Sequence, residues 1–196
     1  ATSLEAFSRY YTQSAWTWEY MALTKARVVW GRKDAVVQLI KDRLCAERNA
    51  ETLKQDVLSM REKIKAQFHG QSVTDQIKYG AGGMIDIEFS VQYLQLLYAA
   101  KYPDLLQKAV VPVLEKAASY ALIAPEAAER LAEAYRLWSF ISGLLSLEQE
   151  DIKARMEELS SSTIKLLCNF NAVKDANALN EKIKQTAQNA ALYRLF

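Results

Sequence analysis

Residues that end helices are scarce in this chain, whose 196 residues include only six glycines and three prolines. Two cysteines, Cys45 and Cys168, lie far apart, and His69 is the one histidine. This excludes a Cys-x-x-Cys or Cys/His zinc motif and indicates a reduced, cytoplasmic setting. No block of five basic residues occurs, and 25 Lys and Arg balance 23 Asp and Glu, so no nucleic-acid surface is expected. No apolar run approaches the roughly 18 residues that cross a bilayer, so no membrane association is expected.

The residues that are present are mostly strong helix formers, namely Ala, Leu, Glu, Lys and Gln, which predicts an all-α fold. We expect an elongated bundle of about eight helices that forms a single domain over 1–196, with a core motif region at 14–100 and C-terminal helices at 104–196. Pro112 is expected to bend its helix, and Pro125 to begin the next one. The predicted helices cover about 3–12, 14–30, 33–47, 49–68, 84–100, 104–121, 125–147, 149–169 and 175–195, with a break at 69–83.

Three of the six glycines, Gly80, Gly82 and Gly83, lie directly before the helix predicted to begin near Met84. Free N–H groups of Gly82 and Gly83 at the positive end of that helix could bind phosphate, with help from Lys78. The segment lacks the Gly-Lys-Ser/Thr ending of a phosphate loop, and no strand precedes it as in a dinucleotide fingerprint. The alternative is that the glycines allow close helix packing or a turn with positive φ.

Asp86 and Glu88 are two residues apart, or about 200° around a helix, so they do not form a carboxylate pair on one face. We therefore predict neither a metal site nor a catalytic residue here. Asp86 in the first turn is explained by favourable interaction with the helix dipole. Glu88, Gln92 and Gln95 are spaced as a polar stripe that faces solvent or a partner domain.

The predicted helix at 14–30 places Trp16, Tyr20, Arg27 and Trp30 on one face. The aromatic side chains are expected to anchor this helix. A cation in such surroundings needs a partner, because an unpaired buried charge is costly. Glu88 is the candidate partner for Arg27. A structural ion pair and a role at a binding site are both compatible with this pattern.

Several blocks of the sequence together resemble the family of bifunctional glutamine synthetase adenylyltransferase/adenylyl-removing enzymes. The resemblance is densest over about 15–100 and covers the rest of the chain more loosely. It points to the helical domain that follows the C-terminal, adenylylating nucleotidyltransferase domain, so it implies a fold like a nucleotidyltransferase substrate-binding domain. The blocks are Trp16-Thr17-Trp18-Glu19, Lys25-Ala26-Arg27-Val28-Val29, Met60-Arg61-Glu62-Lys63, Gly82-Gly83 and Asp86-Ile87-Glu88-Phe89.

The resemblance implies a parent enzyme that transfers AMP from ATP to a tyrosine of glutamine synthetase, under the control of the PII signalling protein and glutamine. The catalytic domain of that family holds magnesium with an Asp-x-Asp pair after a Gly-Ser turn, and neither occurs here. The upstream catalytic domain is therefore expected to be absent from this chain. Alone, the chain is expected to be inactive and to bind neither Mg²⁺ nor ATP tightly.

Within the parent enzyme, the resemblance implies that this domain completes the site for ATP and glutamine synthetase. The expected contacts with the nucleotide or the catalytic domain are Lys78, Gly80, Gly82 and Gly83, with Arg27, Asp86 and Glu88 as supporting groups. The alternative is an interaction module that binds the PII protein or the other catalytic half and makes no nucleotide contact.

Overall fold

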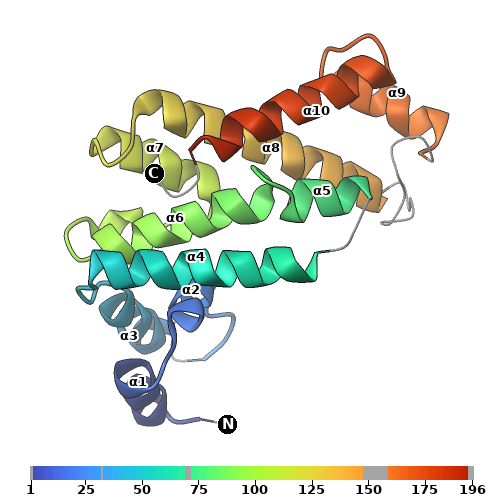
Figure 1. Cartoon of the computed structure of the whole chain (residues 1–196). Coiled ribbons are helices and arrows are strands. Elements are labelled where there is room, and N and C mark those ends of the chain that lie inside the picture. The colour runs from blue at the N-terminus through green and yellow to red at the C-terminus, as the bar shows by residue number, and fades with distance from the viewer. Residues whose placement is uncertain (1, 32, 69–71, 148–158, 194–196) are drawn as a thin grey trace.

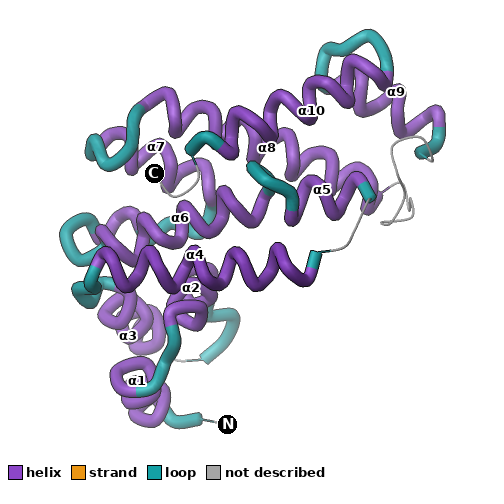
Figure 2. Tube along the Cα trace, viewed as in Figure 1, coloured by secondary structure: helices purple, strands orange, loops and turns teal. Residues whose placement is uncertain are grey.

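The computed structural model describes residues 2–31, 33–68, 72–147 and 159–193. Within these ranges the chain forms ten α-helices, one short 3₁₀ helix (η1) and no strand (Figures 1 and 2), which confirms the all-α prediction. None of the described helices is long and apolar enough to span a bilayer. The elements are α1 (Leu4–Gln13), α2 (Thr17–Lys25), α3 (Lys33–Leu44), α4 (Ala50–Gln67), α5 (Val73–Tyr79), α6 (Met84–Tyr98), η1 (Pro103–Leu105), α7 (Val110–Ser119), α8 (Pro125–Leu147), α9 (Ser161–Phe170) and α10 (Ala176–Ala191).

Helix α6 lies at the centre of the molecule, between α4 on one side and α7 and α8 on the other (Figure 1). Its Ile87, Val91 and Leu94 belong to a large apolar cluster that α5 and α7 to α10 complete. Its Tyr93 and Leu96 belong to a smaller cluster formed with α2, α3 and α4. Because α6 is buried on two faces, both clusters depend on its position.

Polar side chains fix where several helices begin. Ser3 accepts a hydrogen bond from Ala6 N at 3.1 Å, Asn49 from Thr52 N at 2.9 Å, and Asp175 from Ala178 N at 2.8 Å. Each bond satisfies an N–H group that has no partner inside its helix. Helix α8 begins at Pro125, as predicted, where the missing N–H has no cost.

The helix predicted over 14–30 is shorter than expected, because α2 ends at Lys25 and Ala26 is extended. The Thr24 carbonyl, which residue 28 would bond in a continued helix, instead accepts a hydrogen bond from Lys108 Nζ at 2.8 Å. Val28 and Val29 are β-branched and weaken helix propensity further. The prediction that Trp16 and Trp30 anchor this helix is wrong, since both side chains are exposed.

The predicted break at 69–83 is also wrong in part, because α5 occupies Val73–Tyr79. Seven residues are too short to give a clear helical period, and Ser72 supplies the start of α5 by accepting from Asp75 N at 3.0 Å. Pro112 does not bend a helix, because α7 begins only at Val110 and leaves this proline in the first turn. The first part of the helix predicted at 149–169 lies outside the described residues.

The polar stripe predicted on α6 is wrong as well. Gln92 and Gln95 are buried rather than exposed to solvent. Gln95 Nε2 donates to the carbonyl oxygens of Leu105 and Gln107, both at 2.8 Å, and so fixes the turn around η1. Spacing alone could not distinguish this buried amide from a solvent-facing one, because the main-chain partners come from a later segment.

Candidate functional site

The loop between α5 and α6 carries the three glycines that the sequence singled out. Gly82 has φ +72°, and a Cβ atom added there would lie 2.0 Å from the Ala187 carbonyl oxygen of α10. A Cβ atom on Gly83 would lie 2.6 Å from the Ile77 carbonyl oxygen. At both positions the absence of a side chain therefore permits a close approach of backbone to backbone.

The N–H groups of Gly82 and Gly83 are not free to bind a ligand. Gly82 N donates to Asp86 Oδ2 at 2.8 Å, and Gly83 N donates to the Gly80 carbonyl at 3.0 Å. Both glycines are buried. The idea that these two N–H groups form an open phosphate site is therefore wrong, although contacts of the loop as a whole with a partner remain a prediction.

Asp86 is one half of a buried ion pair that closes this loop. Its Oδ1 accepts a hydrogen bond from Arg61 Nε of α4, and each side chain is only 2% exposed. Arg61 Nη2 also donates to the carbonyls of Tyr79 at 2.7 Å and Gly80 at 3.2 Å. The pair thus ties α4 to both ends of the glycine loop, a larger role for Asp86 than the predicted interaction with the helix dipole.

The loop is also held from its other side, by α8. Trp138 Nε1 donates to the Gly82 carbonyl at 3.1 Å, and the Trp138 side chain is buried in the large cluster. Three long helices, α4, α8 and α10, therefore touch a loop of four residues. We interpret the loop as a rigid junction of the bundle.

Two predicted site residues have cationic side chains without partners among the described residues. Lys78 lies in the last turn of α5 and is half-buried. Arg27 lies in the extended segment after α2 and is exposed. No hydrogen bond or ion pair within the described ranges engages either side chain.

Glu88 pairs with Lys25 and not with Arg27. Its Oε2 lies 2.6 Å from Lys25 Nζ, and its Oε1 accepts a hydrogen bond from Tyr135 OH at 3.1 Å. Burial, together with the negative charge of Glu88, raises the pKa of Tyr135 to about 12. The predicted pairing with Arg27 fails because α2 ends before Arg27, so the cation that reaches α6 is Lys25.

Sequence reasoning did not single out Arg61 or Trp138 as site residues. A usable signal existed for Arg61, because it follows Leu53 and Val57 at helical spacing and all three are the buried residues of α4. A charged residue in a buried row requires a partner. No comparable signal existed for Trp138, since its bond to Gly82 joins residues far apart in sequence.

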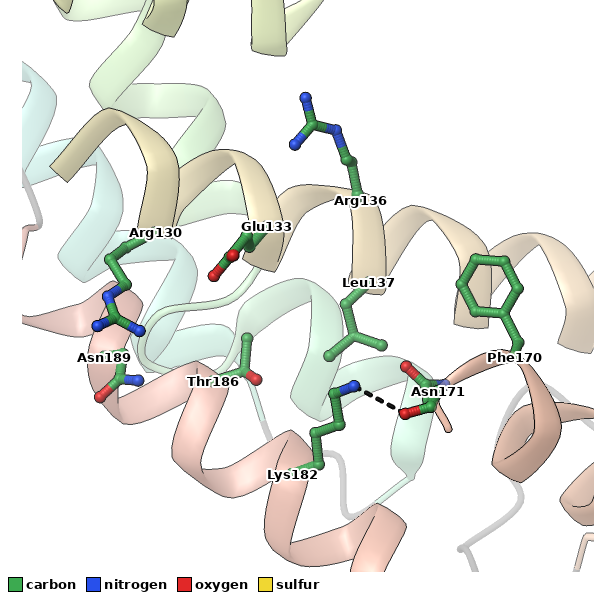
Figure 3. A pocket seen from close by; sticks show the side chains of 9 residues that line it. All are labelled: Arg130, Glu133, Arg136, Leu137, Phe170, Asn171, Lys182, Thr186 and Asn189. Carbon is green, nitrogen blue, oxygen red and sulfur yellow. Dashed lines mark hydrogen bonds between the residues drawn. The ribbon is translucent and has the colours of Figure 1, made fainter. Parts of the chain in front are cut away.

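A polar pocket of about 470 Å³ lies between α8 and α10 (Figure 3). Lys182 reaches across it and donates to the Asn171 carbonyl at 2.9 Å, whereas Arg136 points away from Lys182. Arg130 Nη2 lies 3.9 Å from Glu126 Oε1, and Arg136 Nη2 lies 3.6 Å from Glu115 Oε1. Carboxylates oppose both arginines, and Glu133 also lines the pocket, so its charges are of both signs and do not select an anion.

The described residues bring together no three His, Cys, Asp or Glu side chains that could hold a metal ion. The one buried carboxylate at the glycine loop, Asp86, is occupied by Arg61 and Gly82 N. This part of the chain therefore does not fit the magnesium site of an AMP-transferring enzyme.

Two protein-family models match the chain. The model described as "Glutamate-ammonia ligase adenylyltransferase" matches residues 1–42, and the model described as "GlnD PII-uridylyltransferase" matches residues 51–192. Both descriptions name enzymes that transfer a nucleotidyl group. The fold and these matches together define the class, a helical region of nucleotidyltransferases.

Curated relatives narrow this class to one family. A Bradyrhizobium diazoefficiens protein described as "Bifunctional glutamine synthetase adenylyltransferase/adenylyl-removing enzyme" is 36% identical over 189 residues, which are 95% of this chain and 19% of that protein. A protein of the same description from Rhodopseudomonas palustris (strain BisB5) is 34% identical over 95% of this chain and 19% of that protein. Another, from Xanthobacter autotrophicus, is 38% identical over 75% of this chain and 15% of that protein. The chain belongs to this family, as the sequence resemblance predicted. It spans only 19%, about a fifth, of the length of each of the first two relatives.

Proposed function

We propose that this chain is the non-catalytic helical domain of a glutamine synthetase adenylyltransferase. In this proposal it completes the site at which AMP passes from ATP to a tyrosine of glutamine synthetase, in the regulation of nitrogen metabolism. An upstream nucleotidyltransferase domain would hold Mg²⁺ and ATP. The names of the relatives support this reaction. In this proposal no step of the reaction uses a metal bound by this chain.

The observation that carries the proposal is the exposure of three of the chain's four tryptophans. Trp16, Trp18 and Trp30 are 71%, 53% and 93% exposed; Trp16 precedes α2, Trp18 lies in its first turn and Trp30 follows it. We call them the α2 tryptophans. Large aromatic side chains are costly to leave in water and are enriched at protein interfaces. Their exposure is expected of a surface that another domain of a longer enzyme covers.

The predicted site residues take different roles in this proposal. Lys78 and Arg27, whose cationic groups lack partners in the described ranges, are the candidates for direct contact with the nucleotide or the catalytic domain, and Gly80 lies two residues beyond Lys78. Gly82, Gly83 and Asp86 act indirectly, because their polar groups hold the loop in shape. Glu88 positions α2 through its ion pair with Lys25.

A chimeric enzyme tests the proposal. The matching region of the Bradyrhizobium diazoefficiens relative, 189 residues long, is replaced by this chain. AMP transfer to glutamine synthetase is then measured for the chimera and for the isolated chain. We expect transfer by the chimera and none by the chain alone. Transfer by the isolated chain, or a folded chimera that does not transfer AMP, would count against the proposal.

A second candidate function is an interaction module that binds the PII protein or the other catalytic half. The buried state of Gly82 and Gly83 favours it, because their N–H groups are used within the chain and the two residues pack backbone against backbone. Calorimetry separates the two candidates. If the chain is an interaction module, mixing it with the PII protein should release or absorb heat. Mixing it with magnesium and ATP should then give no heat of binding.

A further inference from the structure

A second pocket, of about 420 Å³, lies where the segment after α2 meets α3 and η1. We call it the α3 pocket. This volume lies within the range of about 300–1,000 Å³ that is typical of small-molecule sites. Its apolar lining comes mainly from Ala26, Val28, Val37, Ile40, Leu44 and Leu106.

The floor of the α3 pocket is continuous with the smaller apolar cluster. Leu44 is a core member of that cluster and is 1% exposed. Ala26, Ile40 and Leu106 pack against the same cluster while also lining the pocket. An apolar ligand group seated there would therefore extend a packed core and would be removed from water.

Among the described residues, the rim of the α3 pocket carries positive charge only. Its charged side chains there are Arg27, Lys33, Lys41 and Lys108, and neither Asp nor Glu belongs to this described lining. Within the described ranges, Arg27, Lys33 and Lys41 have no hydrogen bond or ion pair from their side chains. The carboxylate nearest in sequence to Lys108 is Asp104, which is engaged by Lys116 and Tyr120 at 2.6 Å each.

Lys108 has a fixed position at this rim. Its Nζ donates to the Thr24 carbonyl at 2.8 Å, and burial lowers the pKa of its ammonium group. An ammonium group has three N–H donors, so two remain for another acceptor. The bond to Thr24 lies at the end of α2, directly before the extended segment whose Ala26, Arg27 and Val28 line the pocket.

Helix α3 is patterned for this pocket. Lys33, Val37, Ile40, Lys41 and Leu44 follow one another at helical spacing and all line it. The face thus combines cations with apolar side chains. The pocket between α8 and α10 differs, because the carboxylates of Glu115, Glu126 and Glu133 oppose its cations.

We propose that the α3 pocket binds a small organic anion. Its apolar body rests on the floor around Leu44, and its carboxylate or phosphate head group lies among the four cations of the rim. Unopposed positive charge favours an anionic ligand over a neutral one of the same shape. This site shares Arg27 with the function proposed above, but binding of the anion needs neither the catalytic domain nor glutamine synthetase.

Isothermal titration calorimetry on the 196-residue chain tests the proposal. The probes are octanoate, hexyl phosphate and the neutral analogue octanamide. We expect at least one of the two anions to bind, roughly tenfold or more tightly than octanamide, and more weakly as salt screens the rim. Preference for octanoate or for hexyl phosphate identifies the head group. Equal affinity for the anions and octanamide, or no binding of either anion, would overturn the proposal.

Surface substitutions then locate the site. Lys33→Gln/Lys41→Gln should raise the Kd of the anion by roughly tenfold, since each exposed cation contributes up to about fivefold. The matched control is Lys63→Gln/Lys174→Gln, which removes the same charge from exposed positions outside the pocket. Val37→Glu, on the pocket wall, should abolish binding, whereas Val29→Glu, outside the lining, should not. Equal effects of the test and control variants would contradict the assignment.

Discussion

Among single residues, Arg61 has the largest structural role in the candidate site. Its guanidinium joins α4 to the glycine loop through Asp86, Tyr79 and Gly80. Its Nη1 is buried and has no hydrogen-bond partner within the described ranges. Burying this pair has a high desolvation cost, so its contribution lies in fixing the loop more than in raising stability.

Arg61→Met should lower the free energy of unfolding by about 3–5 kcal/mol, because it leaves Asp86 buried without its cation. Arg61→Met/Asp86→Asn should be less destabilised than this single variant, since it removes both charges and keeps an acceptor for Gly82 N. Urea denaturation measures both. Lys65→Gln, which breaks an exposed pair with Glu62, is the control and should change stability by less than about 0.5 kcal/mol. A double variant that is as destabilised as Arg61→Met, or more so, would contradict this coupling of the two charges.

Tyr135 should make stability depend on pH in alkaline solution. Its pKa is raised from 10.0 to about 12 in the folded state. Below pH 10 both states keep the proton; between pH 10 and about 12 the unfolded state loses it first, so the free energy of unfolding falls. Urea titrations across this window should show a smaller fall for Tyr135→Phe than for the unchanged chain. Identical pH profiles would show that Tyr135 is not the cause.

Among the elements, α5 and α6 show which parts of the fold a sequence can predict. In the sequence, Met84, Ile87, Val91, Leu94 and Tyr98 recur at spacings of three and four, which predicts one apolar face of α6, and all five side chains lie in or against the large cluster. The second buried face, with Tyr93 and Leu96, could not be predicted, because the helices that cover it are distant in sequence. The seven-residue α5 has too few turns to show a period.

The candidate site was harder to predict than the helices. The glycine cluster and Asp86 were identified from their positions in the sequence, but their hydrogen-bond partners were not. Arg61 comes from α4 and Trp138 from α8, and no local pattern links either residue to Gly82. The end of α2 was missed for a similar reason, because Lys108 satisfies the Thr24 carbonyl from a distant segment.

Two glycine substitutions should have opposite effects on stability. Gly82→Ala places a methyl group 2.0 Å from the Ala187 carbonyl oxygen and strains a residue with φ +72°. It should therefore lower the free energy of unfolding by at least about 2 kcal/mol. Gly143→Ala, in α8 with nothing within 4 Å, should stabilise by about 0.5–1 kcal/mol. Thermal unfolding measures both. A neutral Gly82→Ala would show that the loop can move away from α10.

At the scale of the whole molecule, α6 links the two apolar clusters. Because it supplies side chains to both, neither cluster can keep its packing if α6 unfolds. We therefore expect residues 1–196 to unfold in one cooperative transition, as a single domain does. Urea denaturation followed by circular dichroism and by tryptophan fluorescence should give coincident curves. Two separated transitions would show that the clusters are independent units.

At this scale we propose that another domain of a longer adenylyltransferase covers the α2 tryptophans. Trp30 is the best probe, because it is 93% exposed and its replacement should leave the fold of this chain intact. Leu192, which is 80% exposed beyond α10, offers a matched control.

The most direct test is the rate of AMP transfer to glutamine synthetase by the chimeric enzyme carrying Trp30→Ser or Leu192→Ser. We expect a loss of about tenfold or more for Trp30→Ser, since buried aromatic residues dominate interface energies, and a change of less than about twofold for Leu192→Ser. Transfer at an unchanged rate with Trp30→Ser would contradict the claim that this surface is covered in the working enzyme.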